Sequence, residues 1–123
     1  MTRVTSPRFD AERLGLVKAR RDVPAVVAKA SRSDDGKRVS LMVVNRSVDK
    51  EHSAEISVAG FALGKVDCRV LSAASPAAAN GPRLTDTTVA GDVAPRALDC
   101  AKADRITLRL PPNAVTSVVI ERK

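Results

Sequence analysis

Residues 105–120 read RITLRLPPNAVTSVVI, and this stretch decides the fold class. In residues 105–110 every second side chain is aliphatic, which is the period of a β-strand with one buried face. Pro111, Pro112 and Asn113 favour a turn. Residues 115–120 then return as a second apolar strand. We therefore expect two neighbouring strands that close the fold as a hairpin.

The same strand signals recur in four earlier segments. Residues 23–31 are rich in Val and Ala, and residues 39–46 form a second apolar run. Between them, the turn at 33–36 reads SDDG, in which aspartate caps its own backbone and glycine accepts a positive φ. This pair is expected to form a hairpin. Residues 54–59 and 66–71 alternate cleanly and predict two further strands.

Two regions lack this period. Residues 72–104 are mostly Ala, Ser, Pro, Asn, Gly and Asp. They form either a long excursion of irregular chain across the sandwich or a region that contains one short strand near 87–90. Residues 1–22 have some helical character that Gly15 interrupts, and they read equally well as an entry linker. We therefore expect an N-terminal extended segment or linker over 1–22 and a single sandwich domain over 23–123.

Composition argues against several classes of binding protein. The formal net charge is +7, but the basic residues are scattered along the chain, with local clusters only at 18–21 and 37–38. Nucleic-acid-binding proteins gather such charge on one face. There is no Trp or Tyr, and Phe9 and Phe61 are the only aromatic residues. Sugar platforms and base-stacking grooves need flat rings, so this composition argues against both.

No catalytic constellation is visible in the sequence. The carboxylates fall in expected turns or on solvent-facing strand positions. Glycoside hydrolysis requires two carboxylates held close together in surroundings that shift their pKa values, and no such pair is visible. Cys68 or Cys100 with His52 gives a Cys–His pair on paper, but no local signature supports it, and the spacing does not suit zinc. The two cysteines permit one disulfide and equally fit reduced core residues. We expect no catalytic residue, no metal ligand and no cofactor-binding residue here.

The beginning of the chain carries no apolar stretch typical of a signal peptide, because Met1 is followed by polar and charged residues. The longest apolar runs are far shorter than the roughly 20 residues that a membrane-spanning helix needs. These observations predict a cytoplasmic protein with no membrane partner.

Several segments, taken in order, resemble one known family. The run VPAVVAKAS at 23–31, followed by DDGKRVSLMVVNRS at 34–47, is similar to a segment in the C-terminal domain of family 51 α-L-arabinofuranosidases. Gly60-Phe61, then 70–72 and Asn80, match later landmarks of that domain, and 110–120 resembles its closing "LPP-x-S-V-T" segment. Ala114 replaces the usual serine, and 81–104 matches only loosely.

The resemblance implies an all-β fold, an antiparallel β-sandwich of jelly-roll type with about seven or eight strands. It also implies packing against a (β/α)8 catalytic barrel. In that family both catalytic glutamates lie on the barrel, so none is carried over to this chain. Asn45 and the Pro111-Pro112 turn match positions that serve packing.

The leading hypothesis is therefore an accessory, non-catalytic domain of an arabinofuranosidase-like glycoside hydrolase. Its expected partner is the catalytic barrel, and association with further copies of the same chain stays open. Its uncovered face is expected to include Met42, Val44 and Val118. Two alternatives from other classes stay open. One is a free-standing carbohydrate-binding module, which the lack of Trp and Tyr disfavours. The other is a basic nucleic-acid-binding β-domain, which the scattered charge disfavours.

Overall fold

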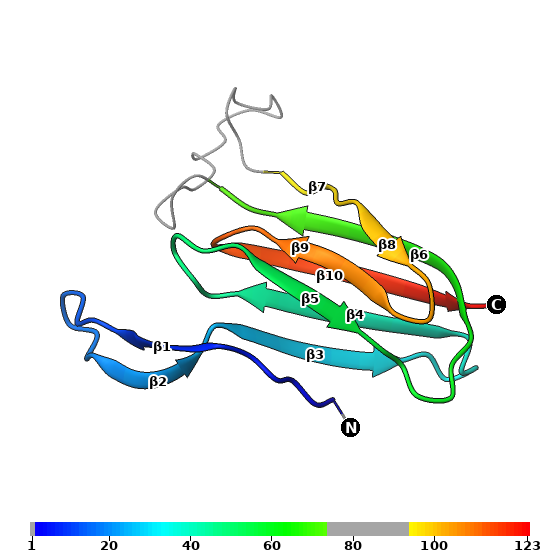
Figure 1. The fold of residues 1–123 in the computed structure, drawn as a ribbon, viewed down its shortest axis with the longest axis horizontal. Helices are drawn as coiled ribbons and strands as arrows, with labels where there is room; N and C mark the ends of the chain where they lie inside the picture. Colours follow the sequence, from blue (N-terminus) through cyan, green and yellow to red (C-terminus); the bar gives the residue numbers. More distant parts are fainter. Residues whose placement is uncertain (1, 74–93) are drawn as a thin grey trace, which may run out of the picture.

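The computed structural model describes residues 2–73 and 94–123, and it is all-β over these residues (Figure 1). Its ten strands are β1 Arg8–Ala11, β2 Arg20–Pro24, β3 Val26–Arg32, β4 Arg38–Asn45, β5 His52–Ile56, β6 Leu63–Leu71, β7 Arg96–Ala97, β8 Cys100–Lys102, β9 Ile106–Leu110 and β10 Ala114–Arg122. The described part of the chain holds no helix, and so none that could cross a membrane.

Two antiparallel sheets form the body of the molecule. The larger has five strands in the order β3-β4-β10-β6-β7, and the smaller has three in the order β5-β9-β8. Figure 1 shows the three-stranded sheet lying across one face of the larger sheet. A separate hairpin of β1 and β2 projects from one end. The predicted antiparallel sandwich is confirmed, with ten strands where about seven or eight were expected.

The core lies between the two sheets and is almost entirely aliphatic. β4 alternates buried and exposed positions, so that Val39, Leu41 and Val43 point inward. The facing layer comes from β9, in which Ile106, Leu108 and Leu110 are at most 2% exposed. Strand periodicity placed these side chains correctly, because successive side chains in a strand point to opposite faces.

The predicted closing hairpin is wrong in one respect. β9 pairs with β5 and β8, whereas β10 pairs with β4 and β6, so the two strands belong to different sheets. The turn at Pro111-Pro112-Asn113 carries the chain across the core from one sheet to the other. The inward faces of β9 and β10 therefore oppose each other. Alternation identifies a buried face but not which strand lies beside it.

The first predicted hairpin is confirmed in part. β3 and β4 pair antiparallel around the turn at residues 33–36, in which Gly36 has φ +68°. The Ser33 hydroxyl and the Lys37 amide donate to Asp35, and these bonds hold the pKa of that carboxyl below its ordinary value. The single strand expected over 23–31 is interrupted at Ala25. Its first residues belong to β2, which pairs with β1.

Two short strands, β7 and β8, lie in the region 72–104, for which the sequence predicted either a long excursion or one short strand near 87–90. β7 extends the larger sheet beside β6, and β8 extends the smaller sheet beside β9. At two and three residues they are too short for an alternating pattern to show. The strand suggested near residues 87–90 lies outside the described residues.

Candidate interaction surface

A row of apolar side chains crosses the outer face of the five-stranded sheet. Val27 on β3 pairs with Val44 on β4, Val44 pairs with Val115 on β10, and Val115 pairs with Leu71 on β6. Each alternates with a core-facing neighbour, so all four point away from the core. Leu71 is 39% exposed, and the other three are half-buried. We call Val27, Val44, Val115, Leu71 and Met42 the outer row.

Met42 extends the apolar surface along β4, beyond Val44. It lies two residues before Val44 on the same face and is 49% exposed. The register places Met42 and Ser117 side by side, with Lys29 at one end and Arg69 at the other. Apolar side chains bordered by charged ones are typical of protein interfaces. The outer row therefore has the composition of a contact surface.

The expected position of one residue in the uncovered patch was wrong. Val118 was expected on the uncovered face together with Met42 and Val44, but it faces the core and is fully buried. Its strand partners are Leu41 and Cys68, both core residues. The sequence around it is an unbroken apolar run, Val118-Val119-Ile120, which gives no indication of which residues face inward.

The opposite side of the sandwich is polar. The outward positions of the three-stranded sheet include Ser53, Glu55, Thr107 and Arg109, all exposed. Arg105 forms an ion pair with Glu55 at 3.0 Å, and a second joins Arg109 to Glu51 at 3.3 Å. Such a face is well solvated and needs no cover. The two outer faces of this sandwich therefore differ in character.

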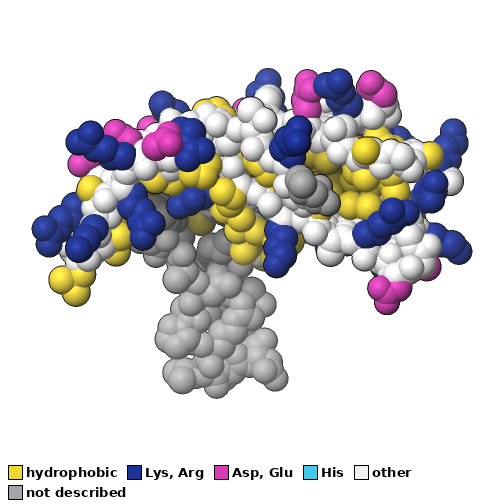
Figure 2. All heavy atoms as spheres, turned by 90° about the horizontal axis from the view of Figure 1, so that it is seen from below, with side chains coloured by type: hydrophobic (Ala, Val, Ile, Leu, Met, Phe, Trp, Pro, Cys, Tyr) yellow, Lys and Arg dark blue, Asp and Glu magenta, His cyan; other side chains and the backbone are white. Residues whose placement is uncertain are grey.

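The edge between β3 and β5 is incompletely closed. A groove of about 530 Å³ runs there, with walls formed by the inward side chains of β3, β4 and β5. Figure 2 looks at this edge and shows hydrophobic side chains exposed between the two layers. Val26, Ala28 and Ile56 are half-buried for this reason. Residues 2–5 and Pro7 lie along the rim of the groove.

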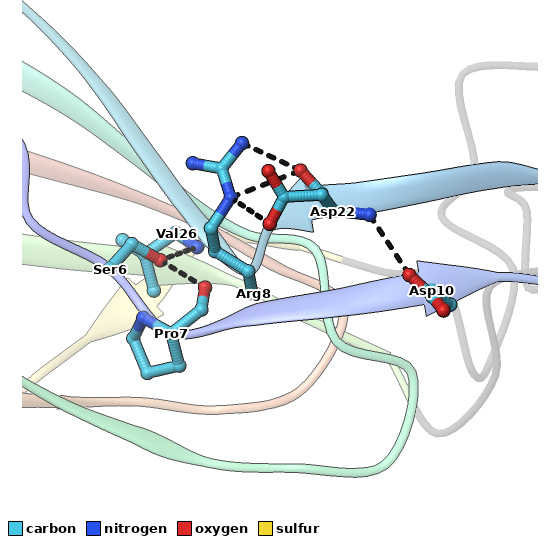
Figure 3. Close-up of polar contacts among 6 residues, drawn as sticks. All are labelled: Ser6, Pro7, Arg8, Asp10, Asp22 and Val26. Atoms are coloured by element: carbon cyan, nitrogen blue, oxygen red, sulfur yellow. Dashed lines mark hydrogen bonds and ion pairs between the residues drawn. The ribbon is translucent and has the colours of Figure 1, made fainter.

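Hydrogen bonds fasten the N-terminal segment beside β3 (Figure 3). The Val26 amide donates to Ser6 Oγ at 2.8 Å, and the Ala25 amide donates to the Pro7 carbonyl at 2.8 Å. Arg8 Nε donates to Asp22 Oδ1 at 2.6 Å within the β1–β2 hairpin. The same hairpin ends in exposed apolar side chains, namely Leu14, Leu16 and Val17.

The architectural role expected for Asn45 is confirmed by its contacts. Its side chain is buried, and its Nδ2 lies 2.8–3.0 Å from the carbonyl oxygens of Lys50, Leu110 and Pro111. Its Oδ1 accepts a hydrogen bond from the Ser47 amide at 2.9 Å. One side chain therefore ties the end of β4 to the crossing between β9 and β10.

His52 does not meet either cysteine. It begins β5, and its strand and the strand of Cys100 flank β9 on opposite sides. Its Nε2 lies instead 2.8 Å from Ser47 Oγ, a pairing that the sequence analysis missed. Ser47 is buried, and its amide donates to the Asn45 side chain. The contact with His52 therefore extends the hydrogen-bond network around Asn45. In the described ranges, no group of three or more His, Cys, Asp or Glu residues is placed to hold a metal ion.

Neither phenylalanine presents a fully exposed ring for sugar stacking. Phe61 is 8% exposed and packs into the core. The guanidinium groups of Arg122 and Arg32 lie 5.7 and 6.0 Å from its ring centre. Phe9 is half-buried in β1. This arrangement gives no support to the carbohydrate-binding alternative.

Comparison with known proteins identifies the architecture. Neither family models nor curated sequences match the chain. Among solved structures, the family 51 α-L-arabinofuranosidase of Bifidobacterium longum matches 95% of this chain with a TM-score of 0.74 and 24% identity. This chain has the fold of a domain of family 51 arabinofuranosidases. The resemblance predicted from the sequence is thus confirmed at the level of the fold.

Two further enzymes of this family show the same likeness. The arabinofuranosidase of Xanthomonas axonopodis pv. citri has a TM-score of 0.69 and 23% identity over 94% of this chain. The thermostable enzyme of Thermotoga petrophila RKU-1 has a TM-score of 0.69 and 18% identity over 97%. The sandwich spans only 21–24% of the length of these three proteins.

Proposed function

We propose that this chain is an accessory, non-catalytic β-sandwich of jelly-roll type that supports the (β/α)8 catalytic barrel of an arabinofuranosidase-like glycoside hydrolase. Residues 23–123 would form the supporting domain, and residues 1–22 would form its connection to the barrel. The chain itself supplies no step of the hydrolysis. Its contribution is to hold the barrel folded by covering part of its surface.

The observation that carries this proposal is the unequal character of the two outer faces. The outer face of the three-stranded sheet presents polar side chains and two ion pairs, whereas the outer face of the five-stranded sheet presents the outer row beside one ion pair, Arg69–Asp67. A sheet with one solvated face normally alternates apolar and polar residues, so an apolar row on the outer face favours a second layer. The matched enzymes have about four-fifths of their length outside this sandwich, which is enough for a barrel of about 250 residues or more.

The exposed apolar tip of the β1–β2 hairpin supports the same occupant. The loop between β1 and β2, which carries Leu14, Leu16 and Val17, lies at the end of the molecule where β4 ends and β10 begins (Figure 1). The outer row lies at the same ends of these two strands. A hairpin tip with a 98% exposed leucine gains free energy when a neighbouring domain covers it. We infer that the barrel contacts both the tip and the row.

The test begins with the reading frame upstream of the codon for Met1. We expect it to encode about 250 residues or more of alternating strands and helices. Absence of such a segment, both in frame and in the adjacent gene, would contradict the proposal.

The second step expresses that barrel with and without this chain and follows hydrolysis of 4-nitrophenyl α-L-arabinofuranoside after heating. The barrel alone should lose activity at a lower temperature. The double variant Met42→Lys with Leu71→Lys should give only partial protection, whereas Ser53→Lys with Thr107→Lys, on the polar face, should protect fully. Equal heat resistance of the barrel with and without the chain would overturn the proposal.

A further inference from the structure

The two cysteines of the chain lie together in the core, although 32 positions separate them in the sequence. Cys68 lies on β6 in the five-stranded sheet and is 4% exposed. Cys100 begins β8 in the three-stranded sheet, is half-buried and packs against the core cluster that contains Cys68. Both are free thiols in the structure. They therefore belong to different sheets and meet between them.

The path of the chain explains why they meet. Stacked sheets lie about 10 Å apart on average, so a disulfide between them needs the two backbones to approach more closely than this mean spacing. Here β7 pairs with β6, and the Leu98 amide then donates to the Cys68 carbonyl at 2.9 Å. Two residues later Cys100 begins to pair with β9 in the other sheet. The chain crosses from sheet to sheet beside Cys68 and so brings Cys100 to it.

We propose that Cys68 and Cys100 form a disulfide that joins the two sheets when the protein meets a disulfide oxidant such as glutathione disulfide. The half-buried Cys100 thiolate attacks the oxidant first, forms a mixed disulfide and releases one glutathione thiolate. The Cys68 thiolate then attacks the Cys100 sulfur and releases the second glutathione thiolate. Overall, two protein thiols are oxidised and one glutathione disulfide is reduced to two thiols.

The second step should limit the rate. Burial, together with the neighbouring Cys100 thiol, raises the pKa of Cys68 to about 12 in the reduced protein. Burial still raises this pKa once Cys100 carries glutathione, and only the thiolate is nucleophilic, so closure of the bridge should be slow at neutral pH and faster at pH 9. At pH 7 the mixed disulfide on Cys100 should therefore accumulate before the bridge closes.

The bridge should make the protein more resistant to heat. It would close a loop of about 33 residues and so reduce the conformational entropy of the unfolded chain. For a domain of this size the midpoint of thermal unfolding should rise by on the order of 10 °C. Reduction with dithiothreitol should restore the original midpoint.

The experiment treats the purified chain with glutathione disulfide at pH 7 and at pH 9 and follows intact mass over time. We expect addition of one glutathione at pH 7 and, faster at pH 9, a product that has lost both thiol hydrogens and carries no adduct. Cys68→Ala should stop at the mixed disulfide, and Cys100→Ala should react only slowly.

Three results would overturn the proposal. The first is a wild-type chain that keeps its adduct at pH 9 without closing the bridge. The second is a product that consists only of dimers linked between molecules. The third is a bridged product that unfolds at a lower temperature than the reduced protein. The wild-type measurements decide the matter even if an alanine variant folds poorly.

Discussion

At the scale of single residues, Asn45 joins several parts of the fold through its buried side chain. Its amide group lies within hydrogen-bond distance of three backbone carbonyl oxygens, and its Oδ1 accepts from the Ser47 amide. Asn45→Ala leaves several buried polar groups without partners, so we expect the free energy of unfolding to fall by roughly 3 kcal/mol. Urea denaturation measures this change.

Asn45→Asp gives a more specific test, because it keeps the shape of the side chain but removes the N–H donors of its amide group. A buried carboxylate facing carbonyl oxygens is worse than a cavity, so this variant should be less stable than Asn45→Ala at pH 7. An aspartate variant as stable as the wild type would show that the amide donors contribute nothing.

At Thr116 we expect a substitution to raise the free energy of unfolding rather than lower it. It is fully buried on β10, and its hydroxyl has no hydrogen-bond partner among the described residues. Valine has nearly the same shape without the hydroxyl, so Thr116→Val should raise the free energy of unfolding by about 1 kcal/mol. Thr107→Val, at an exposed strand position, serves as the control and should change it by less than about 0.5 kcal/mol. A destabilised Thr116→Val protein would reveal a partner for the hydroxyl.

At the scale of strands, the beginning of β6 meets the end of β10 with no room for a side chain. A Cβ atom on Gly64 would lie 2.7 Å from the Glu121 carbonyl oxygen and 2.8 Å from the Lys123 amide nitrogen. These are backbone atoms, so the strands themselves would have to separate. Gly64→Ala should lower the free energy of unfolding by roughly 2 kcal/mol.

The control for this variant is Lys65→Ala, at the next and exposed position, which should leave stability within about 0.5 kcal/mol of the wild type. Chemical denaturation of the two variants side by side measures the difference. If both lose the same amount, the close approach of β6 to β10 is not what requires glycine at position 64.

Strands were predictable from the sequence where they alternate, but the pairing of β3 with β4 was the one strand partnership that it predicted correctly. β9 and β6 follow the two-residue period, so their buried side chains could be named in advance. The placement of β9 and β10 in different sheets depends on contacts between distant residues, which no local pattern encodes. Val118 was misplaced because an unbroken apolar run hides which residues face inward. The short strands β7 and β8 leave no periodic signal at all.

At the scale of the whole molecule, the sequence indicated the sandwich and part of the outer row. The family resemblance came from several segments in order, and the structural matches bear out the fold that it implied. Val27, Val115 and Leu71 escaped prediction because they join Met42 and Val44 only through the strand register. The sequence left a pairing of Cys68 with Cys100 open, because that pairing depends on where the chain crosses from one sheet to the other.

The proposed function requires the outer face of the five-stranded sheet to bind a second layer of protein. Sedimentation velocity of the isolated chain over a wide range of concentration tests this requirement. We expect the wild type to self-associate as its concentration rises, and Met42→Lys with Leu71→Lys to stay monomeric. Ser53→Lys with Thr107→Lys adds the same charge to the polar face and should still associate. A wild-type chain that remains a monomer throughout would contradict this requirement.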